Sequence, residues 1–222
     1  MTARILDGKG IADKLLDDLA QRIAALGDPA QDVGDETAAG AGRALAAHFF
    51  VVKQRHLIRQ RAQVVDLQRF MGTWYVIGRV PNPIERGHVA SVNQFRLRGD
   101  QKVSITYRYR DGFSEPQQEL TVRASVDEKS GNHNWRTWFY KIVPTHTRVL
   151  EVAPDYSWAM LGYPGREMAW IFARQPDMDK ELYKELATRL RDEYGVNTDK
   201  LKRVPQHPEQ VDRLGYEVPN VR

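Results

Sequence analysis

The side chains best suited to metal chemistry are six histidines, and their spacing does not favour a metal site. A metal held by one helix or strand needs histidines at i, i+4 or as His-x-His, so that both rings face the same ion. No such pair occurs in this chain, so we expect neither a bound metal nor a cofactor. A haem held by one histidine near a strand end stays open as an alternative, at His88 or His146. The full set is His48, His56, His88, His133, His146 and His207.

The sequence lacks the usual motifs of nucleophilic catalysis and of phosphate binding. The chain has no cysteine, no Gly-x-Ser-x-Gly and no glycine-rich phosphate loop, which excludes a thiol nucleophile, a serine elbow and a nucleotide cradle. Two acids, Glu85 and Asp155, lie among turn residues, where carboxylates normally bond to the local backbone. We therefore predict no catalytic residue and expect that the protein is not an enzyme.

The distribution of charge argues against nucleic acid as a partner. The net charge is +4, but basic and acidic residues are interleaved along most of the chain and form no basic stripe. No apolar run is long enough for a membrane-spanning helix. The first residues also lack the basic head and apolar core of a secretory signal. As written, the chain is expected to stay in the cytoplasm.

After Phe70 the sequence turns to short runs rich in Val, Tyr, Phe, Trp and Thr, divided by turn residues about every ten positions. This texture predicts antiparallel β-strands. The expected strands are residues 72–80, 89–98, 102–110, 117–127, 135–143, 147–153, 156–163 and 167–174.

Several of these runs alternate strictly between apolar and polar residues. Val103 and Ile105 fall on one face, while Ser104 and Thr106 fall on the other. Eight consecutive antiparallel strands with short connections can hide their edges by closing into an up-and-down barrel, which is wide enough for one small ligand. The predicted class is therefore all-β, with a two-sheet sandwich as the competing architecture.

Helical patterns flank the predicted barrel. Residues 9–26 repeat apolar side chains at steps of three and four, residues 27–43 read as a flexible linker, and residues 44–67 form a second helical stretch. Basic residues within 44–65 suggest a weak contact with a membrane surface, although a solvated helix face explains them as well. We expect residues 1–65 to be an extension of the domain.

A further helix is predicted over residues 176–195, with Pro176 and Asp177 at its start and Gly195 at its end. Its leucines at 182, 186 and 190 share one face and must be buried. Tyr75 and Ile77 point to the outside of the barrel, opposite Trp74 and Val76, so we expect the helix to pack there. Residues 207–222 are expected to be a C-terminal tail.

Three motifs in register carry a resemblance to a known family. They are GTWY at residues 72–75, APDY at residues 153–156 and WIFARQP at residues 170–176. In order and spacing they resemble the three signature regions of lipocalins, especially the bacterial lipocalins related to apolipoprotein D. The resemblance covers residues 66–206. Bacterial relatives often carry a lipoprotein signal that ends in a lipidated cysteine, and this chain shows neither.

The resemblance implies roles for five signature residues. Trp74 would plug the closed end of the barrel, with the guanidinium of Arg174 across its indole, a cation-π contact worth about 0.5–2 kcal/mol. Gly72 would allow a close backbone approach beside it. Asp155 and Tyr156 match the second signature region. These residues are expected to support the fold and not to react.

A shorter stretch, residues 3–26, resembles the first helix of methylenetetrahydrofolate dehydrogenase/cyclohydrolase. Such an enzyme would next need a buried strand, a catalytic lysine and a dinucleotide-binding unit. Residues 27–43 supply none of these, so we expect no folate chemistry.

The predicted function is binding and carriage of a small hydrophobic or amphiphilic ligand, of the fatty acid or lysophospholipid type, inside the barrel. A head group could be held by Tyr107, Tyr109 or Arg86 near the mouth. Two alternatives stay open: an enzyme of lipocalin or remnant folate type, and a surface-interaction protein acting through its basic N-terminal extension. The sequence leaves the oligomeric state undecided. The predicted ligand-binding residues are Val76, Phe95, Leu97, Tyr107, Tyr109, Val122, Phe139, Trp158 and Trp170.

Overall fold

A computed structural model describes residues 64–139, 143–163, 165 and 168–221. The described part from Val65 onward forms one unit. The helix and linker expected over residues 9–43, the folate-type resemblance and nearly all of the stretch 44–67 lie outside the described residues. At the end of that stretch, a single helical turn, α3 (Leu67–Phe70), leads into the first strand.

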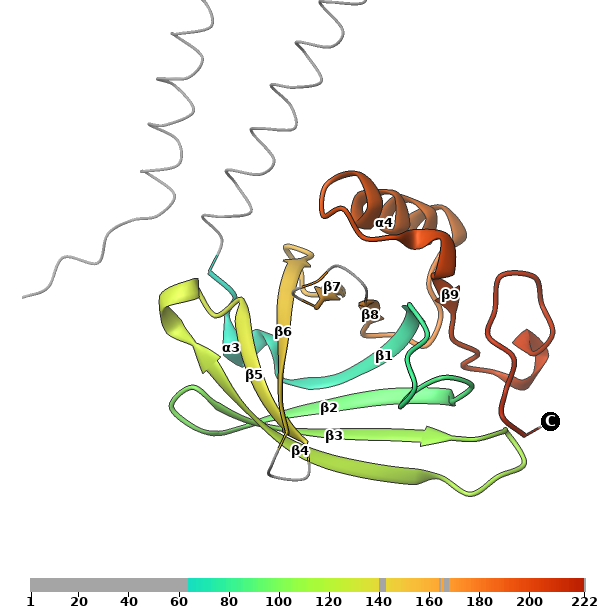
Figure 1. Ribbon diagram of the computed structural model, residues 1–222, viewed down its shortest axis with the longest axis horizontal. Helices are drawn as coiled ribbons and strands as arrows, with labels where there is room; N and C mark the ends of the chain where they lie inside the picture. The colour runs from blue at the N-terminus through green and yellow to red at the C-terminus, as the bar shows by residue number, and fades with distance from the viewer. Residues whose placement is uncertain (1–63, 140–142, 164, 166–167, 222) are drawn as a thin grey trace, which may run out of the picture. The chain divides into compact units, whose positions relative to one another are not determined.

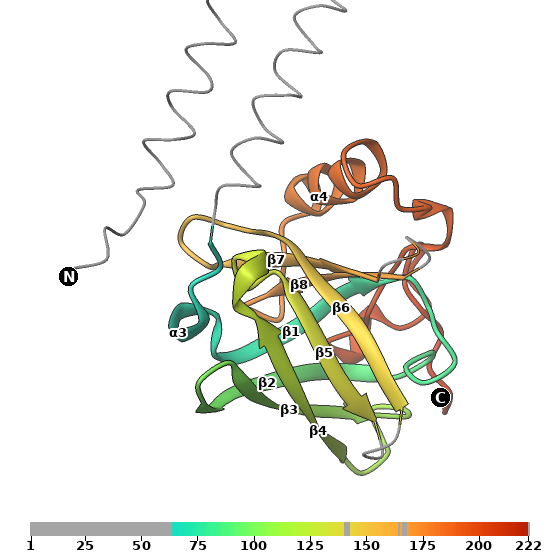
Figure 2. The same ribbon diagram turned by 60° about the vertical axis from the view of Figure 1, so that its left-hand side comes forward.

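Eight antiparallel strands follow in chain order, as the alternating pattern predicted. Each strand pairs with the next, and β1 pairs with both β2 and β8, which closes the sheet into an up-and-down barrel (Figures 1 and 2). The sandwich alternative is therefore wrong. The strands are β1 (Gly72–Arg79), β2 (Val89–Gly99), β3 (Lys102–Arg110), β4 (Gln118–Asp127), β5 (Asn134–Phe139), β6 (Val143–Val152), β7 (Trp158–Gly162) and β8 (Ala169–Ala173).

The boundary between the fifth and sixth strands differs from the prediction. The sixth strand was expected to begin at residue 147, but β6 begins at Val143. The polar run Thr145–His146–Thr147 pairs in full with β5. The backbone groups of this run are paired with β5, so its polar side chains do not prevent it from forming a strand. The side chains alternate between the two faces of the sheet.

The interior of the barrel is filled from its closed end. Phe70 of α3 lies beneath the barrel, with its ring centroid 5.2 Å from that of Trp74, 5.3 Å from that of Phe95 and 5.3 Å from that of Trp135. Phe70 and Trp74 are fully buried. These tilted and edge-on ring contacts are the favourable ones for aromatic pairs. They give the barrel a solid aromatic floor.

The predicted C-terminal helix is α4 (Lys180–Asp192), and it packs on the outside of the barrel (Figure 1). It begins later than expected, because the carboxylate of Asp179 caps it by accepting from the backbone N–H groups of Glu181 and Leu182. Leu186 and Leu190 are fully buried in an outer apolar cluster that includes Ile77 of β1, as the sequence indicated. None of the described helices has the length and hydropathy needed to cross a membrane.

The segment after α4 returns to the barrel. A short strand, β9 (Lys202–Arg203), pairs with the end of β1, and Arg203 also bridges to Tyr216. Ala90 of β2 donates its N–H to the Pro205 carbonyl. The Gln206 side chain donates to the carbonyls of Val76 and Ser91, and so fills the split between β1 and β2. Three single-turn helices complete the fold: η1 (Glu128–Ser130), η2 (Thr198–Lys200) and η3 (Pro208–Gln210).

Candidate functional site

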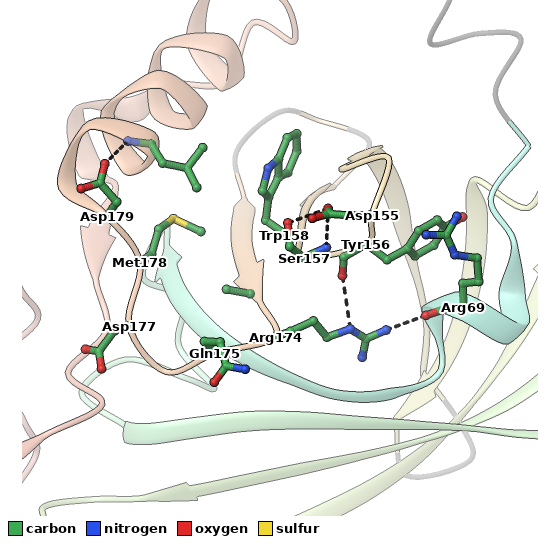
Figure 3. A pocket seen from close by; sticks show the side chains of 12 residues that line it. Arg69, Asp155, Tyr156, Ser157, Trp158, Arg174, Gln175, Asp177, Met178 and Asp179 are labelled. Carbon is green, nitrogen blue, oxygen red and sulfur yellow. Dashed lines mark hydrogen bonds between the residues drawn. The ribbon is translucent and has the colours of Figure 1, made fainter.

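The closed end of the barrel is held by Arg174, which follows β8. Its guanidinium carbon lies 3.7 Å from the centroid of the Trp74 indole. The same group donates to three backbone carbonyls: that of Thr73 at 2.8 Å, and those of Arg69 at 2.6 Å and Tyr156 at 3.3 Å, which Figure 3 shows. Burial lowers the pKa of Arg174 from its usual value. Arg174 therefore joins α3, β1 and the β6–β7 turn.

Gly72 and Trp74 suit this arrangement for local reasons. Gly72 has φ of +96°, and a Cβ on it would lie 3.3 Å from Nη1 of Arg174. A side chain at this position would therefore strain the backbone and crowd the guanidinium. The indole N–H of Trp74 donates to the Phe70 carbonyl at 2.7 Å. Trp74 thus has its polar atom satisfied while fully buried.

The turn between β6 and β7 is fixed by Asp155 and Tyr156. The Asp155 carboxylate accepts from the Ser157 hydroxyl at 2.7 Å and from its backbone N–H at 3.0 Å, and these bonds lower the pKa of Asp155. The Tyr156 hydroxyl accepts from the Asp66 backbone N–H. Arg69 lies over the Tyr156 ring at 4.2 Å. Asp155 and Tyr156 are thus engaged in holding the turn to the barrel.

An open hollow of about 570 Å³ lies on the outside, between this turn and the start of α4 (Figure 3). It is bordered by charged side chains, several of which already bond to the turn, to the α4 backbone or to α3. The charged members are Arg69, Asp155, Arg174, Asp177 and Asp179.

The candidate site is a cavity of about 170 Å³ inside the barrel, above the aromatic floor. Its wall is mostly apolar, with a few amides and hydroxyls and the carboxylate of Glu85, as expected of a small-molecule site. Ile84, in the loop after β1, is 57% exposed and lines the cavity as well, so it marks the mouth. The volume is below the roughly 300–1,000 Å³ usual for drug-sized ligands. It is close to the roughly 150 Å³ of an engineered apolar cavity that binds benzene.

The predicted ligand-binding residues fall into three groups. Phe95, Tyr107, Val122 and Trp170 line the cavity. Val76, Leu97 and Tyr109 belong to the inner core cluster but do not appear in the described cavity wall. Phe139 ends β5, and its side chain lies outside what the structure describes.

The placement of Trp158 inside the barrel was wrong. It pairs with Ala173, and both side chains face the outer cluster beneath α4. The Arg189 guanidinium of α4 lies 5.5 Å from the Trp158 ring. The β7 run Trp-Ala-Met-Leu is apolar on both faces because α4 covers its outer side, so alternation could not indicate the direction of Trp158.

Sequence reasoning missed most of the wall. Ile105, Leu120 and Phe172 share the parity of residues predicted in their own strands, so the same alternation would have found them. Leu161 lies on the face of β7 opposite to Trp158, so it was missed together with the misplacement of Trp158. The wall residues with hydroxyl groups, and those in the loop after β1, do not follow the apolar–polar alternation from which the interior residues were predicted. The remaining wall residues are Asn82, Ile84, Glu85, Asn93, Trp135, Thr137, Thr145, Thr147, Tyr163 and Met168.

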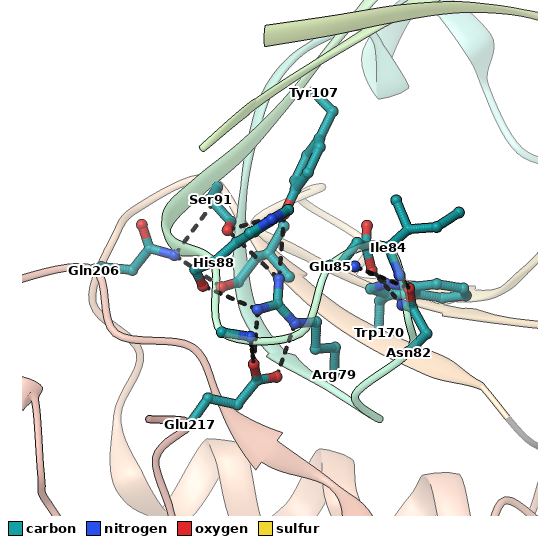
Figure 4. Close-up of polar contacts among 12 residues, drawn as sticks. Arg79, Asn82, Ile84, Glu85, His88, Ser91, Tyr107, Trp170, Gln206 and Glu217 are labelled. Carbon is teal, nitrogen blue, oxygen red and sulfur yellow. Dashed lines mark hydrogen bonds and ion pairs between the residues drawn. The ribbon is translucent and has the colours of Figure 1, made fainter. Parts of the chain in front are cut away.

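A buried polar network stands beside the cavity at its open end. Arg79, at the end of β1, is fully buried and donates to both carboxylate oxygens of Glu217 at 2.8 Å (Figure 4). It also donates to the His88 carbonyl at 2.9 Å and to the Tyr107 hydroxyl at 3.3 Å. Burial alone would lower the pKa of Arg79, but its bonds to Glu217 raise it on balance. Arg79 is therefore held as a cation paired with Glu217.

Tyr107 and His88 complete this network. Burial raises the pKa of Tyr107 above its ordinary range, which keeps the hydroxyl protonated. The His88 Nδ1 lies 3.1 Å from that hydroxyl, and the His88 ring stacks on Tyr109 at 3.7 Å. Burial, followed by the nearby Arg79, lowers the pKa of His88. The imidazole is thus neutral at neutral pH.

The described residues do not form a metal site, and no histidine lines the described cavity. Within residues 64–139, 143–163, 165 and 168–221, no cluster of three His, Asp or Glu is placed to hold a metal. His88 is engaged with Tyr107 and Tyr109, and His146 is exposed on β6. Neither histidine is among the described residues of the cavity wall, where the haem alternative would need one.

The head-group residues proposed from the sequence do not face the cavity with free groups. The Tyr107 hydroxyl is taken up by Arg79, His88 and Ser91. The Tyr109 hydroxyl donates to Gln118. Arg86 is exposed and is absent from the described wall.

Comparison with known proteins gives a consistent picture. Residues 65–206 match the family model of the lipocalin-like domain. Temperature-induced lipocalin-1 of Arabidopsis thaliana is 28% identical over 154 residues, covering 64% of this chain and 80% of the relative. The outer membrane lipoprotein Blc of Vibrio cholerae is 25% identical over 145 residues, covering 64% of this chain and 82% of that protein.

The architecture also matches solved structures. Insecticyanin from the tobacco hornworm Manduca sexta superposes with a TM-score of 0.51 at 15% identity, covering 70% of this chain and 86% of that one. At that identity the likeness shows the fold alone.

Proposed function

This chain belongs to the lipocalin-like domain family, and from that premise we propose that its barrel binds and carries a small hydrophobic or amphiphilic ligand without transforming it. The observation that carries the proposal is the apolar cavity of about 170 Å³ between the aromatic floor and the loop after β1. A barrel of this size need not be hollow, since its interior can be filled by side chains. The unfilled space is what binding requires.

The volume limits how much of a ligand the barrel can hold. An engineered cavity of about 150 Å³ holds one benzene, so about six carbons fit inside this one. A fatty acid or lysophospholipid chain, as expected from the sequence, would place its end in the barrel and the rest in the mouth. Six buried methylenes gain about 5 kcal/mol in total. Association costs of at least about 4 kcal/mol leave weak, reversible binding unless the head group adds contacts.

Native mass spectrometry of the purified chain tests the proposal. We expect a fraction of the protein to carry an added mass that disappears after washing with organic solvent, and an amphiphile in the extract with that same mass. The delipidated protein should then bind straight-chain alcohols saturably at one site. A protein without added mass that also fails to bind any alcohol would contradict the proposed function.

A further inference from the structure

Glu85 brings a carboxylate to the wall of the cavity at its mouth. The side chain is half-buried, and its Oε2 accepts from the Trp170 indole N–H at 2.7 Å and from the Asn82 amide at 2.7 Å (Figure 4). Asn82 in turn accepts from the backbone N–H groups of Ile84 and Glu85. The carboxylate is therefore fixed by a turn on one side and by β8 on the other.

This carboxylate is the charged group of the described cavity wall. The other polar wall residues are neutral amides and hydroxyls, and no Lys, Arg or His occurs among the described residues that line the space. Within the described part of the chain, Glu85 makes no ion pair. Its second oxygen, Oε1, is thus available to a ligand at the mouth.

The nearest buried cation, Arg79, attracts Glu85 but forms its ion pair with Glu217. Arg79 gives two hydrogen bonds to Glu217 and a third to the His88 carbonyl, so its charge is matched by Glu217. His88 lies within reach of Asp111, with 3.6 Å between Nε2 and Oδ1. Among the described residues that line the cavity, the formal charge is therefore the negative charge of Glu85.

We propose that Glu85 is a head-group site, which makes the barrel prefer alkyl amphiphiles with a cationic or hydrogen-donating head over those with a carboxylate. An ammonium group at the mouth would donate a charge-assisted hydrogen bond to Glu85, with its alkyl chain in the cavity. A carboxylate there would be repelled by Glu85, and no cation among the described residues of the cavity wall would offer it an ion pair. This inference rests on the proposed function and narrows its ligand class: the fatty acid expected from the sequence is disfavoured.

Three ligands with the same chain test the preference: octylamine, octan-1-ol and octanoate, titrated at neutral pH and low salt by ligand-detected NMR. We expect octylamine to bind most tightly and octanoate least, with about a tenfold ratio between their dissociation constants. The ratio should shrink as NaCl is added, because the pair at the mouth is partly exposed. This comparison needs no variant.

Glu85→Gln supplies the matched variant. Its amide oxygen can still accept from Trp170 and Asn82, so the loop keeps its bonds while the charge is lost. Octylamine should then lose its advantage over octan-1-ol. Glu128→Gln, an exposed carboxylate in η1 at the closed end, should retain the wild-type ratio.

The outcomes separate the two proposals. If all three ligands bind with equal dissociation constants, or if octanoate binds most tightly, the proposed head-group site at Glu85 is wrong. The proposal that the barrel carries a ligand is then unaffected. If octylamine keeps its advantage in Glu85→Gln, the charge preference does not come from Glu85. If no ligand binds saturably, both proposals are wrong.

Discussion

Arg79 and Glu217, separated by 138 residues in sequence, form a buried two-hydrogen-bond ion pair at the open end of the barrel, with side-chain exposures of 0% and 4%. Glu217 also accepts from the Gly87 backbone N–H at 2.8 Å. It therefore connects β1 and the loop after β1 to a segment that lies beyond the residues matched by the family model. The residues around Glu217 thus lie in the same compact unit as the barrel.

Glu217→Ala should lower the free energy of unfolding by about 3–5 kcal/mol, because it leaves the Arg79 guanidinium buried without its partner. Urea denaturation measures the change. The matched control is Glu209→Ala, an exposed acid in the same segment, for which we expect a change within about 0.5 kcal/mol. The double variant Arg79→Met, Glu217→Leu should recover part of the loss. Equal stability of Glu217→Ala and Glu209→Ala would show that the ion pair does not secure the segment.

Trp74→Ala should destabilise the protein by about 3–5 kcal/mol, since it removes a fully buried aromatic ring and leaves a hole in the floor. Trp138→Ala is the control, because this half-buried indole on the outer face of β5 has a guanidinium, that of Arg136, 4.5 Å from its ring. It should cost clearly less. A melting curve unchanged by Trp74→Ala would refute the role of Trp74 as the plug.

Stability should fall as the pH drops below about 6.5, the ordinary pKa of histidine. Burial and Arg79 lower the pKa of His88 in the folded protein, while Asp111 and Glu217 oppose this. Between the folded and unfolded pKa values the unfolded chain binds the extra proton, so stability rises with pH in that window. Thermal melts from pH 7.5 to 5.5 should show a smaller slope for His88→Gln. His146→Gln, at an exposed site on β6, should keep the wild-type slope. If the dependence of stability on pH is the same in His88→Gln as in the wild type, His88 is not the cause of that dependence.

The affinity for straight-chain alcohols should rise about fourfold per methylene while the added carbons enter the cavity, at about 0.8 kcal/mol each. The rise should flatten beyond about six to eight carbons, when a space comparable to a benzene-binding cavity is filled. Titration from butan-1-ol to decan-1-ol measures this. An unbroken rise to ten carbons would mean that the barrel opens further than its 170 Å³.

The sequence predicted the elements of the fold well because they depend on local patterns. The alternation in β3 and β4 and the leucine spacing in α4 each reflect one buried face. Trp158 was misplaced because β7 is buried on both faces and has no alternation to read. Glu217 and Glu85 carried no local signal, since Glu217 pairs with Arg79 across 138 residues and Glu85 bonds to Trp170 across 85. The residues at the mouth are defined by contacts made only after the barrel closes.

The most direct test of the account is to block the cavity from its wall. Thr145 of β6 is half-buried and lines the cavity, so Thr145→Trp should place an indole in the ligand's space. Thr121→Trp makes the same change on the outer face of β4, where Thr121 is exposed and bonds to Thr106.

The measurement is the dissociation constant of octan-1-ol for both variants, once circular dichroism has shown them folded. We expect binding at least about tenfold weaker in Thr145→Trp, a loss of roughly 1.4 kcal/mol, and wild-type binding in Thr121→Trp. Equal binding by the two folded variants would contradict a ligand site inside the barrel.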